Sequence, residues 1–321
     1  MRLAELPQPA VRAHLCGHGL TLVTGALRTR IRSALPAVAD GLASLYADFP
    51  VEPDARFADF HVAMARPLGL RRWYRPHALF FFDGRSVFKP LPLNQAFPML
   101  EWGLNWCVTT QIQHRLLFHA AVVARGERAL LLPGPPGSGK STLCAALASC
   151  GWRLLSDELA IVDLDDASLQ PLARPVSLKN ASIAAIRSFA PRAFVSEPCH
   201  DTLKGTVAHL RPSRESVDAM RVPGRSAWIV FPEYRPGAAT RLTAEAPEAG
   251  FFRLLKNAFN YAALGARAFE RSVDLVAGSD CYDLVYSNLE EAVARLGELE
   301  AGAGAGSTGD VPGAAAGSGA P

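Results

Sequence analysis

Residues 134–142 read GPPGSGKST, and this stretch decides how the rest of the chain is interpreted. It fits the pattern G-x-x-x-x-G-K-[S/T] at every defined position. An apolar run at residues 129–132 precedes it and a helical pattern at residues 141–149 follows it, which is the strand–loop–helix setting that the motif requires. The sequence therefore predicts a phosphate-binding loop formed by Gly134, Pro135, Pro136, Gly137, Ser138, Gly139, Lys140, Ser141 and Thr142.

The chemistry of this loop predicts its ligands. Glycines allow backbone N–H groups to converge on phosphate oxygens, and the helix N-terminus adds the positive end of its dipole. In such loops the lysine, here Lys140, reaches the β- and γ-phosphates, and the hydroxyl, here Ser141, ligates Mg²⁺. We therefore expect ATP and Mg²⁺ as cofactors. Motors, transporters and switches share the loop, so the reaction has to be inferred from other residues.

The elements around the loop predict an α/β fold. Strands are expected at residues 116–123 and 129–132, a helix at 141–149, and further strands at 152–155 and 160–164. This order resembles a βαβ unit in which the strand at 152–155 lies beside the loop strand and parallel to it.

Two acids follow the strand at 152–155. Asp157 and Glu158 stand sixteen residues beyond Ser141, so they are expected at the strand end next to the phosphate-binding loop. A carboxylate there can accept a proton from a hydroxyl or hold Mg²⁺. His119 lies on the strand that precedes the loop, where a histidine is either a catalytic residue or a packed core residue.

The chain divides into three parts. Residues 1–105 are expected to form a separate N-terminal α+β lobe with a hairpin at Asp83-Gly84, a helical stretch at 29–48 and a helix at 97–114 leading out of it. Residues 106–299 are expected to form the domain that carries the loop, with a long helix at 251–269 and a last helix capped by Ser287 and Glu290. Residues 300–321 are rich in Gly, Ala and Ser and are expected to be disordered.

Composition excludes some classes of protein. The net charge of +3 over 321 residues argues against binding to nucleic acid or a membrane surface. Six scattered cysteines without a C-x-x-C pair, and an N-terminus without a signal-peptide pattern, favour a cytoplasmic protein. Only five residues are lysines, among them Lys140, Lys179 and Lys204, so a lysine here is more apt to serve where a compact ammonium is needed.

Three motifs together resemble the HPr kinase/phosphorylase family, and in particular the HPr-kinase-related proteins of the kinase A type. They are His119 in FHAAVV, the loop GPPGSGKST, and the acids in RLLSDELAIV, in the order and spacing of that family over residues 105–300. The resemblance implies a P-loop core related to phosphoenolpyruvate carboxykinase, and transfer of the ATP γ-phosphate to a serine of a protein or peptide. It also implies Asp157 as general base, Glu158 with Ser141 on Mg²⁺, His119 near the transferred phosphate, and a homo-oligomer.

The chain departs from that family at two points. The second acid is Glu158, where bifunctional members have Asp. Their E-x-R-G segment corresponds to Thr202-Leu203-Lys204-Gly205, which lacks the acid, so phosphorylase activity is not expected. Asp201 is a candidate replacement for that acid. Lys204, in the segment that ends at His209, suits either close approach to a phosphate or a surface loop.

Two other functions are compatible with the sequence. A small-molecule kinase also places an acid after this kind of loop, although such kinases are shorter and lack a front lobe. A nucleotide-dependent binding protein with slow hydrolysis would use residues 1–105 to dock a partner and would transfer no phosphate. Transfer that requires Asp157 separates the kinase from the binding protein.

Overall fold

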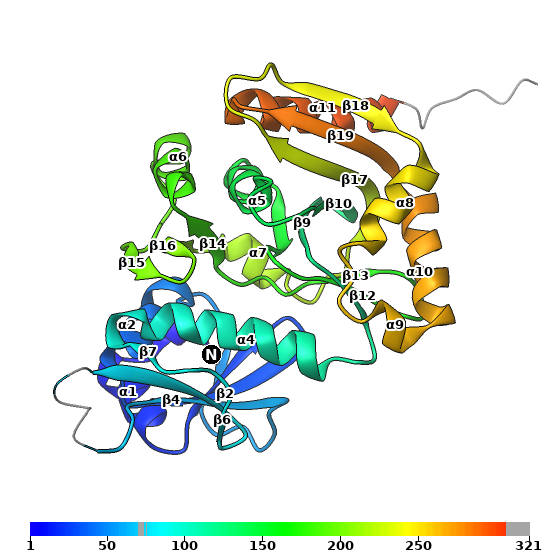
Figure 1. Cartoon of the computed structure of the whole chain (residues 1–321). Coiled ribbons are helices and arrows are strands. Elements are labelled where there is room, and N and C mark those ends of the chain that lie inside the picture. Colours follow the sequence, from blue (N-terminus) through cyan, green and yellow to red (C-terminus); the bar gives the residue numbers. More distant parts are fainter. Residues whose placement is uncertain (70–73, 75, 306–321) are drawn as a thin grey trace, which may run out of the picture.

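Two lobes lie one above the other, with helix α4 (Ala96–Gln111) along the surface where they meet (Figure 1). The computed structural model describes residues 1–69, 74 and 76–305, so most of the expected disordered tail, residues 306–321, lies outside the described residues. The fold is mixed α/β, as the sequence predicts.

The front lobe is built on a seven-stranded sheet in which all pairs are antiparallel except β2 with β4. Its path is β3 (Val51–Glu52), β1 (Leu20–Thr24), β2 (Leu27–Ser33), β4 (Phe60–Ala65), β5 (His77–Phe82) and β6 (Arg85–Ser86), with β7 (Leu91–Pro92) also paired to β5. Helical elements accompany the sheet: η1 (Leu3–Glu5), α1 (Gln8–Cys16), α2 (Pro36–Leu45), η2 (Leu93–Gln95) and α4. The predicted hairpin at Asp83-Gly84 is confirmed by the pairing of Phe82 with Arg85.

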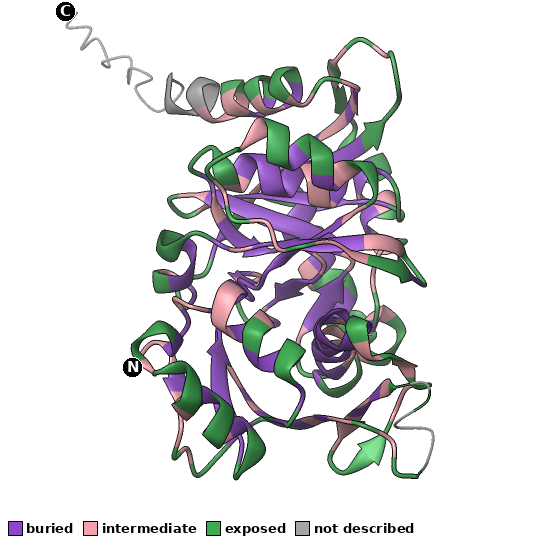
Figure 2. Ribbon diagram, turned by 90° about the vertical axis from the view of Figure 1, so that its left-hand side faces the viewer, coloured by how far each residue is buried: buried purple, intermediate pink, exposed green. Residues whose placement is uncertain are grey.

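The second lobe contains a six-stranded sheet that is buried on both faces (Figure 2). Its order is β11 (Arg153–Ser156), β9 (Ala120–Arg125), β10 (Arg128–Pro133), β17 (Arg225–Tyr234), β19 (Asp280–Tyr286) and β18 (Arg241–Glu245). Successive side chains of a strand point to opposite faces. Leu130 and Leu132 of β10 accordingly pack with α5 (Lys140–Ser149) and α11 (Leu289–Ala305), whereas Leu131 packs with α8 (Pro247–Leu255) and α10 (Ala266–Ala277).

Two small sheets connect the lobes. One has the order β13 (Leu169–Gln170), β12 (Ala160–Val162), β8 (Leu116–Phe118), and the other β14 (Val176–Lys179), β16 (Gly205–Leu210), β15 (Cys199–Thr202). The remaining helices are α6 (Ala181–Phe189), α7 (Arg214–Asp218) and α9 (Tyr261–Leu264). One hydrophobic cluster joins Leu104 and Val108 of α4 to Leu117, Leu159 and Leu172 of the second lobe, so the front lobe is packed firmly against it.

The sheet order corrects the expected βαβ unit. Strands β10 and β11 do run in the same direction, but β9 lies between them and is antiparallel to both. The loop strand and the strand before Asp157 are therefore second neighbours. They still end at the same edge of the sheet, where β9 begins, and this places Asp157, His119 and Gly134 along one edge.

Three local predictions were wrong. Residues 29–48 form the end of β2 and then α2, separated at Pro36, which begins the helix. Residues 251–269 form three helices, because Asn260 bonds to the backbone of β8 and Gly265 adopts a φ of 57° before α10. The last helix is capped by Asn288, whose Oδ1 accepts the N–H of Glu291 at 3.1 Å, and the Ser287 hydroxyl instead donates to the carbonyl of Ala238.

Candidate functional site

The predicted phosphate-binding loop runs from the end of β10 to the start of α5. Gly137 and Gly139 have φ values of 87° and 96°, which favour glycine. A Cβ added at Gly139 would lie 2.2 Å from the hydroxyl oxygen of Tyr286, and that hydroxyl donates to the Gly139 carbonyl at 3.1 Å. The N–H of Tyr234 also donates to the Ser138 carbonyl at 3.0 Å. The ends of β17 and β19 thus hold the loop in its conformation.

Lys140 is buried inside this loop. Its Nζ donates to the carbonyls of Gly134 and Pro135, the second at 2.9 Å. Burial lowers the pKa of Lys140 to about 8, although the nearby carboxylates of Asp157 and Glu158 oppose the shift. No side chain caps the N-terminus of α5, so the first N–H groups of that helix, including those of Ser141 and Thr142, are left for another acceptor. Ammonium and helix N-terminus together form a site suited to phosphate.

Asp157 lies just beyond β11 and is 6% exposed. The N–H of Ser177 donates to its Oδ2 at 2.9 Å, whereas its buried Oδ1 has no well-formed hydrogen bond within the described part of the chain. Burial, and then the charge of Glu158, raise the pKa of Asp157 to about 6, against the opposing effects of the Ser177 N–H and the Ser141 hydroxyl. A carboxylate with this pKa and one open oxygen can accept a proton near neutral pH.

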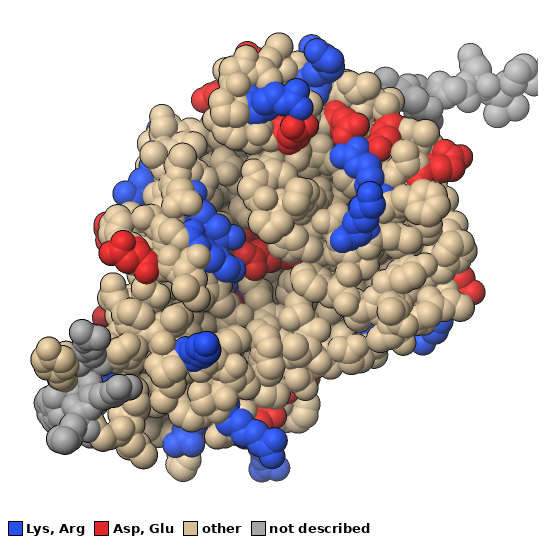
Figure 3. All heavy atoms as spheres, in the orientation of Figure 1, with Lys and Arg blue, Asp and Glu red and all other residues tan. Residues whose placement is uncertain are grey.

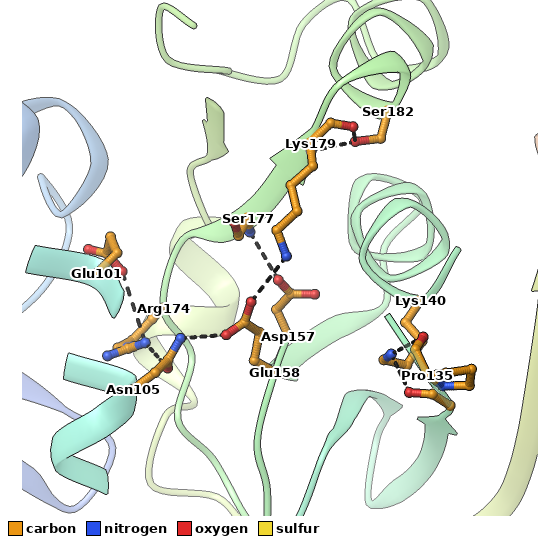
Figure 4. Close-up of polar contacts among 11 residues, drawn as sticks. Glu101, Asn105, Pro135, Lys140, Asp157, Glu158, Arg174, Ser177, Lys179 and Ser182 are labelled. Carbon is orange, nitrogen blue, oxygen red and sulfur yellow. Dashed lines mark hydrogen bonds and ion pairs between the residues drawn. The ribbon is translucent and has the colours of Figure 1, made fainter. Parts of the chain in front are cut away.

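Glu158 points away from Asp157 toward two partners (Figure 4). The amide Nδ2 of Asn105 donates to its Oε2 at 2.7 Å, and the Nζ of Lys179 lies 3.5 Å from its Oε1. Burial acts to raise the pKa of Glu158, but the positive charges of Lys179 and Lys204 outweigh it and lower the pKa. Glu158 therefore remains ionised.

His119 lies between β8 and β9 at the same edge of the sheet. Its backbone N–H donates to the carbonyl of Asn257 at 2.6 Å, and its ring meets the edge of Phe259 at 5.9 Å between centroids. Burial, and then the charge of Lys140, lower the pKa of His119. The imidazole is therefore neutral near pH 7, and it faces an open cleft lined also by residues 133–136, Phe231 and residues 256–259.

The charges of two lysines lower the pKa of Glu158. Lys179 ends β14 and forms the ion pair already described. Lys204 lies on the turn between β15 and β16, with its Nζ 5.1 Å from the centre of the Trp102 ring. Burial lowers the pKa of Lys204, while Glu158 acts to raise it. Figure 3 shows acidic side chains deep in the hollow between the lobes, with basic side chains on both rims.

Other residues near Lys204 in the sequence make no contact with the carboxylates of Asp157 and Glu158 among the described residues. His209 is 2% exposed and packs on Phe97 at 5.6 Å between ring centroids, and burial lowers its pKa to about 4. The backbone carbonyl of Asp201 accepts from Gln95, and no contact in the described ranges joins its carboxylate to Asp157 or Glu158.

Sequence reasoning missed the residues that close the site from the front lobe. A narrow cavity beside the acids is lined by Glu101, Trp102, Asn105, Asp157, Glu158, Arg174, Ser177 and His209, together with Ser156, Leu172 and Pro175. Trp102 Nε1, Ser177 Oγ and His209 Nε2 are buried there without hydrogen-bond partners in the described part of the chain. Helix α4 supplies three of the lining residues, and no local sequence motif predicts them.

The donor set fits Mg²⁺. This ion takes oxygen ligands, and beside a nucleotide it needs only one or two carboxylates, with phosphates and waters completing its shell. The Ser141 hydroxyl and Oε1 of Glu158 are oxygens of the required kind. Within residues 1–69, 74 and 76–305, no group of three or more His, Cys, Asp or Glu side chains could hold a metal without a nucleotide.

Comparisons with known proteins found little. No family model matches the chain, and no curated protein matches it. Several solved structures match; among them, the Hpr(Ser) kinase/phosphatase from Coxiella burnetii superposes on 58% of this chain and 98% of its own, with a TM-score of 0.27 and 12% sequence identity. A score of this size does not establish a common fold, so the function is inferred from the residues of this chain alone.

None of the helices in the described ranges has both the length and the apolar character that a bilayer crossing requires.

Proposed function

We propose that this chain is an ATP-dependent kinase that transfers the γ-phosphate of ATP to a serine hydroxyl of a protein or peptide. One observation carries the proposal: a buried carboxylate, Asp157, with a pKa of about 6 and an open Oδ1, stands beside a loop that buries the ammonium of Lys140. A phosphate site and a proton acceptor are the two parts that phosphoryl transfer to a hydroxyl needs.

The residues would divide the work as follows. Backbone N–H groups of Gly134 and residues 137–142, together with Lys140, would hold the phosphates of the nucleotide. Lys140 Nζ would leave the carbonyls of Gly134 and Pro135 for phosphate oxygens. Ser141 and Glu158 would hold Mg²⁺, which when bound neutralises charge on the β- and γ-phosphates.

In the transfer step, the acceptor oxygen bonds to the γ-phosphorus as the bond from that phosphorus to the β–γ bridging oxygen breaks. The hydroxyl proton passes to Oδ1 of Asp157, and ADP leaves. His119, neutral and at the edge of the open cleft, would lie near the transferred phosphate as a hydrogen-bonding partner. The open cleft then serves as the approach to the phosphates from outside.

A serine acceptor comes from the resemblance of the three motifs, and the open cleft beside the loop, which is lined by residues of the second lobe, is compatible with a protein or peptide chain. No feature of the described residues favours a small-molecule acceptor or a protein that binds nucleotide without transfer. We keep both as outcomes of the experiment.

The test uses purified protein, Mg²⁺ and γ-labelled ATP with an extract of the host's small proteins and peptides. Wild type, Asp157→Asn and Lys140→Ala are compared, with Lys89→Ala as control because Lys89 is exposed on the front lobe. Label on a protein or peptide with wild type and the control alone supports the kinase, and mass spectrometry identifies the acceptor. Label only on small metabolites indicates a small-molecule kinase. Nucleotide binding without label on any fraction favours the nucleotide-dependent binding protein.

A further inference from the structure

A side chain of the front lobe makes the shortest contact to Glu158. Asn105, on α4, donates from Nδ2 to Oε2 of Glu158 at 2.7 Å, across 53 positions of sequence. The other contact of this carboxylate, with Lys179, is longer, at 3.5 Å, and comes from β14. Glu158 is thus held between the two lobes.

The orientation of the Asn105 amide is itself fixed. Its Oδ1 accepts a hydrogen bond from Nη2 of Arg174, whose side chain is 9% exposed. A guanidinium can only donate, so Oδ1 must face Arg174 and the donating Nδ2 must face Glu158. Arg174 in turn lies 4.0 Å from Glu101, which accepts the hydroxyl of Tyr46 at 2.7 Å. This series of polar contacts runs from Tyr46, in the core of the front lobe, to Glu158.

Holding one oxygen of Glu158 decides where the other one points. The terminal torsion of a glutamate is soft, so a carboxylate without a fixed partner can rotate. With Oε2 on Asn105, Oε1 is turned toward Lys179 and the site (Figure 4). Partners that hydrogen-bond a ligating carboxylate affect metal affinity by about 10- to 100-fold when removed.

We infer that Asn105 is a positioning residue, which holds Oε2 of Glu158 so that its other oxygen, Oε1, meets the nucleotide-bound divalent cation. The front lobe therefore completes the phosphate-transfer site, whatever it contributes to acceptor recognition. This inference rests on the proposed function, because it assigns Glu158 to the cation. Helix α4 suits the role because Leu104, Cys107 and Val108 around Asn105 are buried in the cluster that joins the lobes.

The informative variant is Asn105→Asp. It has the shape of Asn105 and keeps an oxygen for Arg174, but it replaces the donor facing Glu158 with a carboxylate oxygen. Asn105→Ala is the second variant, and Asn94→Ala is the matched control, since Asn94 is an exposed asparagine of the same lobe. Binding of Mn²⁺ in the presence of a non-hydrolysable ATP analogue is measured by electron paramagnetic resonance. Binding of the analogue without metal, and the melting temperature, are measured in parallel.

We expect Mn²⁺ affinity to fall about 10- to 100-fold in both variants, with metal-free analogue binding unchanged and the control equal to wild type. Mn²⁺ affinity within threefold of wild type in either folded variant would overturn the inference. So would loss of the folded state in both variants, because Asn105 would then be a structural residue. If wild type itself binds the analogue without any effect of Mn²⁺ and transfers no phosphate, the proposed function fails, and the inference falls with it.

Discussion

Two sides of the site differ in the groups that form them: one, the loop wall, is mainly backbone, and the other, the helix wall, is mainly side chains. The loop wall, residues 134–139 with Lys140, consists largely of backbone, and its carbonyls and N–H groups converge because three glycines permit it. The helix wall, α4 with Arg174, consists of side chains that reach Glu158 through Asn105. A backbone wall suits any phosphate chain, whereas a side-chain wall can orient one particular carboxylate. Asp157 lies between the two walls.

The largest expected effect concerns the residue between the walls. Asp157→Asn keeps the shape of the side chain but removes the proton acceptor, so we expect the rate of phosphate transfer to fall about 10²- to 10⁴-fold. Nucleotide affinity should change little, because the loop wall is intact. Single-turnover transfer and equilibrium nucleotide binding measure the two quantities separately. Equal losses in both would show that Asp157 belongs to nucleotide binding and would break the distinction between the walls.

The effects of Lys179 and Lys204 on kcat are expected to differ. Lys179 forms an ion pair with Glu158, the proposed ligand of the divalent cation, so Lys179→Ala should lower kcat about 10- to 100-fold. Lys204 lies over the Trp102 ring, a contact of about 0.5–1 kcal/mol at exposed sites, and Lys204→Ala should lower kcat only about 2- to 5-fold. Steady-state kinetics with Lys89→Ala as control measure both. The reverse ranking would mean that the turn between β15 and β16 carries the phosphate contact.

The loop wall could be predicted from the sequence, and the helix wall could not, for a physical reason. The loop residues are contiguous, so their spacing alone defines the strand, the turn and the helix N-terminus. The position of Asp157 also followed from spacing, since two strands running in the same direction end at one edge even with β9 between them. Asn105 and Arg174 meet through packing of the lobes, across 69 positions of sequence, and neither residue lies in a motif.

The same reasoning explains the helices that were placed wrongly. Apolar spacing over residues 251–269 favours a helix, but the side chain of Asn260 bonds to the backbone of Leu117 and Arg115, and this tertiary contact ends the helical run. At the last helix, both Ser287 and Asn288 are good capping residues. The Ser287 hydroxyl donates to the carbonyl of Ala238, which is distant in sequence. Asn288 therefore caps the helix instead of Ser287. Local patterns cannot foresee such partners.

The pH dependence of kcat/KM tests the two titrating groups together. Burial raises the pKa of Asp157 to about 6, so below that pH the base is protonated and transfer should fall about tenfold per pH unit. Burial lowers the pKa of Lys140 to about 8, so above that pH the free protein loses its ammonium and nucleotide capture should weaken. We expect a bell-shaped profile. In Asp157→Asn the residual activity should lose the acidic limb, and an acidic limb that persists there would assign it to another group.

The stability of the loop wall gives an effect that can be isolated with a pair of glycines. Gly139 and Gly151 both have positive φ, 96° and 84°, but only Gly139 has a neighbour, the Tyr286 hydroxyl, where a Cβ would stand. Alanine at either position costs about 1 kcal/mol or more through the backbone, and Gly139→Ala should cost about 1–2 kcal/mol beyond Gly151→Ala through this contact. Chemical denaturation measures the free energy of unfolding. Because Tyr286→Phe removes the clashing oxygen, the extra cost should shrink in that background. If it does not, the loop is held by something other than the end of β19.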